Sequence, residues 1–332
     1  MSARIVTLTV NPAVDLSAQA ASVRPGHKIR TFDERYDPGG GGINVARVIH
    51  ELGGEALALF ASGGVTGRFV EQMLTQARVP WQAVLVGGST RISMTVRDRS
   101  NGQEYRFVPQ GPRLTAAECA DILETLKHVE ADWVVASGSL APGMPADFYA
   151  EVARISAARG ARFVLDTSGP ALAASIGHGI FLLKPSLSEL ETIVGRKVRD
   201  LDDQMEQSRS LVRSGAAEMI ALTLGSDGAI LATTDRTHHL PALPVTQRTG
   251  VGAGDSFLAG LVLALAGGQS VNQALRLAMA CGAAAVQGDG TAQVRRTDVS
   301  ALLGLIPPEK IADGSGTSEL SPSLSAPAAR GP

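Results

Sequence analysis

One glycine-rich segment near the end of the chain combines residue types that suit the transfer of a negatively charged group. It reads Gly-Val-Gly-Ala-Gly-Asp-Ser-Phe over residues 250–257 and directly precedes a predicted helix. Small residues let the backbone approach a ligand, and the N–H groups of a first helical turn attract anions. Asp255 could there accept a proton from an attacking hydroxyl. Taken alone, the segment equally suits close helix packing, with Asp255 favouring only the start of the helix.

A second glycine-rich loop, at residues 39–42, also precedes a predicted helix. Four consecutive glycines lose much conformational entropy on folding, so they indicate a place where the backbone meets a polar ligand. Asn44, within the first turn of that helix, could bond a sugar hydroxyl. The alternative is a flexible hinge.

Several common site patterns are absent from the sequence. It contains no G-x-x-x-x-G-K-[ST] phosphate loop and no G-x-G-x-x-G dinucleotide motif. No group of His, Cys, Asp and Glu residues has the spacing of a zinc site. A tight structural metal and a classical dinucleotide site are therefore not expected.

Three cations, Lys28, Arg30 and Arg91, lie near segments that are predicted to be strands. Lys28 and Arg30 alternate and would point to one face of a strand. Converging cations bind phosphate, and arginine does so through its planar fork. Each cation taken singly is more often a solvated surface charge.

Polar residues also follow the ends of predicted strands. Asp15 follows the turn after the first strand, and Asp166, Lys184 and the segment 137–139 lie at or just past later strand ends. In an open α/β sheet the ligand crevice lies beyond the carboxyl ends of the strands. These positions favour a site there, although polar residues at strand ends are also common caps.

The elements that must position these residues alternate along most of the chain. Strands are predicted at 4–10, 56–61, 133–136, 162–166, 180–184, 219–223 and 229–233, and helices at 43–52, 66–76, 116–129, 145–159, 188–194, 202–214, 254–266 and 271–287. This alternation predicts a parallel sheet that is covered on both faces by helices.

One region breaks the alternation. Strands are predicted at 83–86, 91–97 and 104–108 with no helix between them, and Asn101-Gly102 is a strong hairpin signal. With a more polar strand predicted at 28–36, they could form a small separate sheet.

The composition is that of an ordinary globular protein. A formal net charge of −2 over 332 residues gives no general attraction to nucleic acid or membranes, and 4% aromatic residues argue against base stacking. The longest apolar stretch, 257–266, is half of what a membrane span needs. With two isolated cysteines, Cys119 and Cys281, and no leader pattern, the chain is expected in a reducing cytoplasm.

Together these residues resemble the ribokinase-like (PfkB) family of sugar kinases. The family motifs are Gly-Gly-Gly-Gly-Ile-Asn-Val-Ala-Arg at 39–47 and Gly-Ala-Gly-Asp at 252–255, and the likeness extends over residues 7–297. It includes Asn-Pro-Ala-Val-Asp at 11–15 and Lys-Pro at 184–185. The two motifs in this order and separation are highly specific.

The resemblance implies a fold and a division of the chain. The fold is an α/β/α sandwich of three layers with a small β-sheet lid over the sugar site, and such lids often pair in a homodimer. The implied segments are a core of 1–10, 37–82 and 109–310 and a lid of 11–36 and 83–108. The composition of the remaining segment, 311–332, rich in Ser, Pro, Ala and Gly from Gly314 on, predicts a disordered tail.

The resemblance also implies roles for individual residues, with ATP and Mg²⁺ as the nucleotide and the metal. Asp255 would be the base, beside an anion hole formed by the N–H groups of Gly252, Ala253 and Gly254. The sugar hydroxyls would be held by Asp15, Gly40, Gly41 and Asn44, and the sugar phosphate by Lys28, Arg30, Arg91 and Ser139. The nucleotide would be bordered by Lys184, Ser186, Thr223, Gly225 and Gly228. Magnesium would be organised by Glu189 and, through water, by Asp166.

Two positions depart from the family pattern. Ser186 stands where the metal-organising motif Asn-x-x-Glu has asparagine, and Gly250 stands where threonine is usual. A serine hydroxyl can still hold water or a phosphate oxygen but is shorter, and Gly250 loosens the loop.

Three functions are compatible with these residues. The first is phosphorylation of fructose 6-phosphate to fructose 1,6-bisphosphate, and the second is the same chemistry on tagatose 6-phosphate or fructose 1-phosphate. The third is a sugar-phosphate sensor without activity, because a fold does not fix a function. An intact Asp255 argues against the sensor, which has no need of a base.

Overall fold

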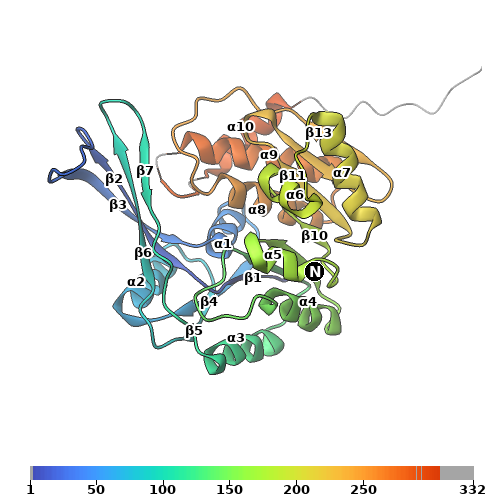
Figure 1. The fold of residues 1–332 in the computed structure, drawn as a ribbon, viewed down its shortest axis with the longest axis horizontal. Helices are drawn as coiled ribbons and strands as arrows, with labels where there is room; N and C mark the ends of the chain where they lie inside the picture. Colours follow the sequence, from blue (N-terminus) through green and yellow to red (C-terminus); the bar gives the residue numbers. More distant parts are fainter. Residues whose placement is uncertain (1–2, 289, 293, 307–332) are drawn as a thin grey trace, which may run out of the picture.

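Figure 1 shows a large β-sheet enclosed by helices and a small sheet that projects from it. The computed structural model describes residues 3–288, 290–292 and 294–306. Across the large sheet the strand order is β13-β12-β11-β10-β9-β8-β1-β4-β5, and the neighbours from β11 to β5 run parallel. In that order the strands span Thr237–Leu240, Ala229–Ala232, Met219–Thr223, Leu182–Leu183, Arg162–Asp166, Trp133–Ser137, Ile5–Thr9, Ala56–Ser62 and Trp81–Leu85.

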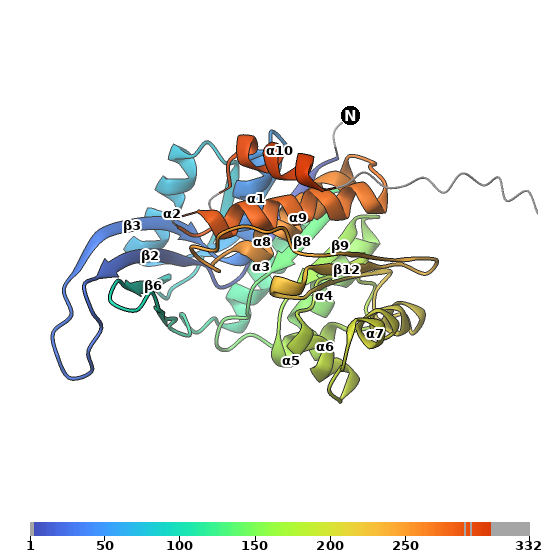
Figure 2. The same ribbon diagram turned by 90° about the horizontal axis from the view of Figure 1, so that it is seen from above.

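Helices cover both faces of the large sheet, as Figure 2 shows. One layer consists of α1 (Gly41–Glu51), α2 (Gly64–Gln76), α8 (Ala253–Ala266), α9 (Val271–Gln287) and α10 (Arg296–Leu305). The other consists of α3 (Ala116–His128), α4 (Phe148–Ala158), α5 (Gly169–Ser175), α6 (Leu187–Val194) and α7 (Leu201–Arg213), and a short 3₁₀ helix, η1, spans Gly225–Asp227. The predicted three-layer α/β/α sandwich is therefore confirmed.

The central strands are apolar on both faces because helices pack against both. All five residues of β1 and all five of β8 are buried. On the α1 side, α8 and α9 pack closely because residue 260 is glycine. A Cβ atom at Gly260 would lie 2.7 Å from the Cys281 Sγ atom. Cys281 is thus a core residue, and Cys119 is also a buried free thiol.

The small sheet contains β3 (Thr31–Gly39), β2 (Ala13–Ala20), β6 (Arg91–Asp98) and β7 (Glu104–Phe107), in that order. Its register gives it two different faces. One row across the four strands is apolar and consists of Tyr36, Leu16, Met94 and Phe107. The opposite face carries polar residues at alternate positions, among them Asp15, Asp37, Ser17 and Arg35.

The prediction that residues 83–86 belong to the small sheet is wrong. Residues 81–85 form β5, which pairs in parallel with β4 at the edge of the large sheet. The helix α2 connects these two strands, so β4, α2 and β5 form one βαβ unit.

Two further sequence-based boundaries also need correction. Strand β2 was not predicted, because Asn-Pro at 11–12 indicated a turn, whereas the strand starts directly after it. The strand predicted at 28–36 is β3 at 31–39, so residues 37–39 belong to the small sheet and not to the core. The predicted disordered tail, 311–332, lies outside the described residues.

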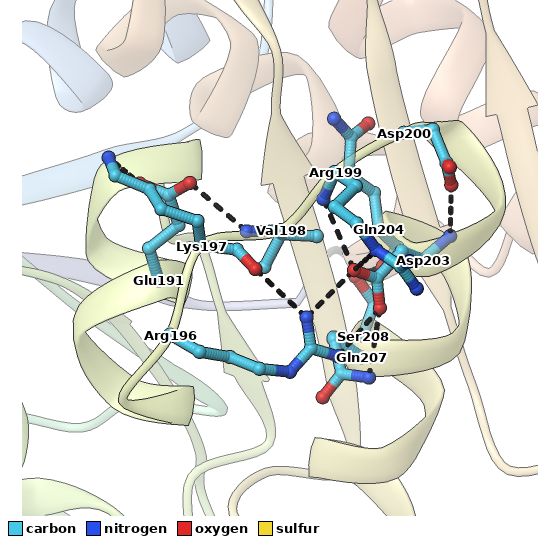
Figure 3. Close-up of polar contacts among 10 residues, drawn as sticks. All are labelled: Glu191, Arg196, Lys197, Val198, Arg199, Asp200, Asp203, Gln204, Gln207 and Ser208. Atoms are coloured by element: carbon cyan, nitrogen blue, oxygen red, sulfur yellow. Dashed lines mark hydrogen bonds and ion pairs between the residues drawn. The ribbon is translucent and has the colours of Figure 1, made fainter.

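The connection between α6 and α7 is held by ion pairs, which Figure 3 shows in detail. The Arg196 guanidinium lies 2.7 Å from the Asp203 carboxylate, and the Lys197 ammonium lies 2.7 Å from that of Glu191. Hydrogen bonds from Arg196 hold the pKa of Asp203 well below its usual range. These pairs connect the end of α6 with the start of α7.

Within the described residues, no helix has both the length and the apolar composition that crossing a membrane requires.

Two leucines of the large sheet provide a matched test of where the core lies. Leu8 in β1 is fully buried, whereas Leu85 in β5 is 78% exposed. We expect Leu8→Ala to lower the free energy of unfolding by about 2–5 kcal/mol, because it removes buried methyl groups and leaves a cavity. Leu85→Ala should change it by less than about 0.5 kcal/mol. Urea unfolding measures both, and equal losses would contradict the fold.

Candidate functional site

Helix α8 begins at a backbone conformation that only glycine adopts readily. Gly252 precedes the helix with a φ of 77°, and a Cβ atom there would lie 2.6 Å from the Ala292 nitrogen. The N–H groups of the first turn of a helix have no acceptor within it and carry a partial positive charge. The turn at 252–254 is therefore suited to receive an anion, as predicted, and Asp255 is the next residue.

Asp255 is a buried carboxylate held by side chains from two other elements. Its Oδ2 atom accepts a hydrogen bond of 2.9 Å from the Asn44 amide of α1. Its Oδ1 atom lies 3.4 Å from the Ser137 hydroxyl at the end of β8. Burial and the nearby Asp166 carboxylate raise the pKa of Asp255, and the Asn44 bond opposes this rise. A basic, oriented carboxylate is what proton transfer from a hydroxyl requires.

Lys184 and Asp166 form a buried ion pair beside Asp255. The Lys184 ammonium lies 3.0 Å from Asp166 Oδ1, and the Ser137 hydroxyl lies 3.2 Å from Asp166 Oδ2. Burial lowers the pKa of Lys184, but its attraction to Asp166 and Asp255 outweighs this, so the net pKa is raised. A Cβ atom at Gly254 would lie only 3.4 Å from Lys184 Nζ. One permanent positive charge therefore lies directly against the anion-binding turn.

The glycines at 39–42 let other chain segments approach α1 very closely. A Cβ atom at Gly39 would lie 2.3 Å from Asp15 Cγ, and one at Gly41 would lie 2.1 Å from Ser137 Oγ. Gly40 has a φ of 114°, which side chains rarely permit. Close packing on Asp15 and Ser137, more than hinge flexibility, explains this glycine run.

Asp15 lies on the polar face of the small sheet, close to Asp255. Its pKa is raised to about 6, mainly by burial; a hydrogen bond with the Thr291 side chain opposes the rise, and the Asp255 carboxylate adds to it. Its partner across β3 is Asp37. Such a carboxylate can accept hydrogen bonds from sugar hydroxyls that approach Asp255.

Sequence reasoning did not assign three residues that support this arrangement, namely Arg47, Asp37 and Thr291. Arg47 donates to Asn44 Oδ1 at 3.3 Å and to the Thr291 carbonyl at 3.3 Å, and it pairs with Asp37 at 3.4 Å. Arg47 thus orients the amide that contacts Asp255. The sequence signal that could have identified Arg47 is its position at the end of Asn-Val-Ala-Arg in the first family motif.

The three predicted phosphate-binding cations are not brought together in this chain. Arg91 donates to the carbonyls of Pro109 and Asn11 at 2.9 Å each, beside Asp15. Lys28 and Arg30 do not lie on a strand as predicted. They are exposed in the connection between β2 and β3, about seven residues or ~23 Å along β2 from the position of Arg91. Ser139 is also exposed.

A mostly apolar cavity of about 710 Å³ opens beside the anion-binding turn. The predicted nucleotide residues Thr223, Gly225 and Gly228 line it, together with Phe257 and Gly254. Its size lies within the range of small-molecule sites, and its apolar walls suit a nucleotide base. A nucleotide bound there would direct its phosphates toward Gly254 and Lys184.

Ser186 and Glu189 form the N-terminal capping box of α6. The Ser186 N–H donates to Glu189 Oε2 at 2.8 Å, and the Glu189 N–H donates to Ser186 Oγ at 3.4 Å. This local role accounts for serine at position 186. No group of three metal-ligating side chains occurs in the described part of the chain. The carboxylates of Asp166 and Glu189, both near Lys184, fit the mode in which Mg²⁺ is bound mainly by substrate phosphates and water.

Comparison with known proteins identifies a family of kinases. The model of the "pfkB family carbohydrate kinase" matches residues 8–298. The chain is 43% identical to the ATP-dependent 6-phosphofructokinase isozyme 2 of Mycobacterium tuberculosis, over 91% of this chain and 89% of that protein. It is 35% identical to the Escherichia coli isozyme 2, over 87% and 94%. The crystal structure of E. coli phosphofructokinase-2 with fructose-6-phosphate superposes with a TM-score of 0.87 at 32% identity, over 92% and 99% of the two chains.

Removal of the buried ammonium tests the electrostatics of the site. We expect Lys184→Met to lower the free energy of unfolding by about 3–5 kcal/mol at pH 8, because Asp166 and Asp255 lose their counter-charge. The loss should be smaller at pH 5. Uncompensated carboxylates resist ionisation in the folded protein but ionise near pH 4 in the unfolded chain, so stability falls as the pH rises above that value.

Thermal unfolding at the two pH values measures this dependence. Lys197→Met is the matched control, because Lys197 pairs with Glu191 at the surface and is 88% exposed. Equal losses at pH 5 and pH 8 for Lys184→Met would contradict the proposed charge balance.

Proposed function

We propose that this chain, which belongs to the pfkB family of carbohydrate kinases, phosphorylates fructose 6-phosphate at its 1-hydroxyl with ATP. Family membership makes it an ATP-dependent sugar kinase. The choice of sugar rests on the similarity to 6-phosphofructokinases over nine tenths of the chain. The observation that carries the chemistry is the buried Asp255 carboxylate, oriented by Asn44 at 2.9 Å and adjacent to the anion-binding turn.

The mechanism follows from the positions of the residues around Asp255. Asp15 and Asn44 hold the sugar hydroxyls, so that the 1-hydroxyl faces Asp255. Asp255 accepts the proton of the sugar hydroxyl as the hydroxyl oxygen attacks the γ-phosphorus. The bond from the γ-phosphorus to the bridging oxygen breaks, and ADP leaves. The N–H groups at 252–254 and the Lys184 ammonium stabilise the charge on the transferred phosphoryl group. The small sheet serves as a lid that excludes water, which is a competing acceptor.

Magnesium is part of this proposal. It would be held by the nucleotide phosphates, with Asp166 and Glu189 as the protein groups, the former through water. Bound there, it neutralises phosphate charge. The backbone N–H of residue 186 donates to Glu189 Oε2 at 2.8 Å and orients its carboxylate, and serine and asparagine both supply this N–H.

Two other functions are compatible with this site. Tagatose 6-phosphate or fructose 1-phosphate would use the same base and anion-binding turn, since the phosphate contacts decide between these sugars. A sensor without activity would explain Gly250 and Ser186, but it leaves the oriented Asp255 without a purpose.

The test of substrate choice is a coupled ADP-release assay with Mg-ATP. Fructose 6-phosphate is expected to give the highest kcat/KM among fructose 6-phosphate, tagatose 6-phosphate, fructose 1-phosphate and free fructose. Preference for another phosphorylated sugar would replace the proposed substrate and keep the mechanism. Folded protein without turnover on any of them would favour the sensor.

Asp255→Asn separates the role of the base from binding. The amide is nearly isosteric, so the fold and ATP affinity should persist, while kcat falls by about 10²- to 10⁴-fold, the usual contribution of a general base. Steady-state kinetics and nucleotide titration measure the two effects. Near-normal turnover would remove Asp255 from the mechanism.

We further propose a homodimer formed through the apolar face of the small sheet. Tyr36 and Phe107 belong to its apolar row and are 49% and 58% exposed, and Ile92 on the same face is 44% exposed. Pairing of two such faces would bury these side chains. It would also account for Lys28 and Arg30 as phosphate ligands, if each subunit presented them to its partner. The buried free thiols agree with a reducing cytoplasm.

The dimer is tested by Phe107→Glu, which places a charge in the apolar row. We expect the variant to sediment as a monomer at concentrations at which the unmodified protein is a dimer. Leu305→Glu is the control, because Leu305 is 64% exposed on α10, which belongs to a helical layer of the large sheet. An unmodified protein that sediments as a monomer would refute the proposal.

A further inference from the structure

A second cavity, of about 570 Å³, lies against the polar face of the small sheet. Among the described residues that line it are four arginines, Arg35, Arg97, Arg99 and Arg248, and two carboxylates, Asp33 and Glu104. Asp15, Asn44 and Asp255 are not among them. We call this space the arginine cavity.

The strand register gathers donors on one wall of the arginine cavity. Arg35 on β3 lies opposite Ser17 on β2, and Ser17 lies opposite Thr95 on β6. Arg97 follows Thr95 by two residues and so points to the same face. Two hydroxyls thus lie in one row with the Arg35 guanidinium, and Arg97 lies in the next row, opposite Gln19 and Glu104.

Among the described residues that line the cavity, arginines outnumber carboxylates, although Glu104 of β7 lies opposite Arg97. Arg35 pairs with Asp37 at 3.1 Å, but the same carboxylate also pairs with Arg47. Arg97 donates to the backbone carbonyl of Arg248 at 3.3 Å rather than to a carboxylate. Asp33 accepts a hydrogen bond from the Gln19 amide at 3.2 Å. Like charges gathered in a concave space attract anions.

One loop separates the arginine cavity from the nucleotide cavity. Gln247 and Gly250 line the nucleotide cavity, whereas Arg248, Thr249 and Val251 line the arginine cavity. The Val251 N–H donates to Thr249 Oγ1 at 3.2 Å, and its carbonyl accepts from the Ala292 N–H at 3.2 Å. The loop then continues into the anion-binding turn at Gly252. The same loop would therefore contact ligands in both cavities.

We propose that the arginine cavity is a second anion site, for a phosphorylated small molecule, and that binding there changes the affinity for the nucleotide. Guanidinium groups bind phosphate oxygens in pairs, and the volume suits a small phosphorylated molecule. The coupling runs through the loop at 247–251. Because coupling is reciprocal, the nucleotide changes the affinity of the anion by the same factor.

Calorimetric titration with inorganic pyrophosphate tests the site. The full-length protein is first saturated with a non-hydrolysable Mg-ATP analogue, so that the nucleotide site is filled. Arg97→Gln and Arg35→Gln should each weaken pyrophosphate binding by about tenfold or more, the usual effect of losing a hydrogen bond between charged groups. Arg106→Gln is the matched control, because Arg106 is exposed opposite Thr95 but does not line the cavity.

Three results would overturn the site. They are the absence of pyrophosphate binding to the saturated protein, an equal loss in Arg106→Gln, and binding that Arg91→Gln abolishes while the cavity variants retain it. The last result would assign pyrophosphate to the acceptor phosphate site.

The coupling has its own measurement. Pyrophosphate should shift the nucleotide affinity of the unmodified protein by about fivefold or more, the lower range of allosteric effects, and shift it less in Arg97→Gln. Nucleotide affinity that does not respond to pyrophosphate would refute the coupling. None of these readouts uses turnover, so they are independent of which sugar the enzyme phosphorylates.

Discussion

The site depends on one constraint, the compensation of negative charge within the buried ends of the central strands. Asp166 and Asp255 are placed close together by β9 and α8, and the Lys184 ammonium is the positive charge between them and the anion-binding turn. The Ser137 hydroxyl lies within 3.4 Å of both carboxylates. The neighbouring strands β8, β9 and β10 bring Ser137, Asp166 and Lys184 to one edge of the sheet. The base and the phosphate-binding charge therefore cannot be positioned independently.

Local signals predicted the core fold and the centre of the site. Central strands such as β1 and β8 are buried and rich in β-branched residues, and their alternation with helices predicts a parallel sheet. Asp255, Asp166 and Lys184 could be found because each lies directly at the end of an element, where its position follows from the element itself. The family motifs then supplied their roles.

Pairing between distant segments could not be predicted in the same way. β2 lies beside both β3 and β6, and its polar residues give no single-sequence strand signal, so it was missed. β5 was assigned to the wrong sheet because its sequence alone does not say which partner strand it joins. Lys28 and Arg30 were placed on a strand that in fact starts three residues after Lys28, at Thr31. The support of Asn44 by Arg47 and Asp37 depends on side-chain geometry that spacing does not encode.

The contact between Gly41 and Ser137 restricts the order in which this site can evolve. Since a Cβ atom at position 41 would lie 2.1 Å from the Ser137 hydroxyl, any side chain there requires β8 to move or position 137 to shrink first. Even the loss of the hydroxyl in Ser137→Ala leaves the Ser137 Cβ position, 2.9 Å from that atom. The two residues are thus epistatic, and a lineage that retains the serine is confined to glycine at position 41.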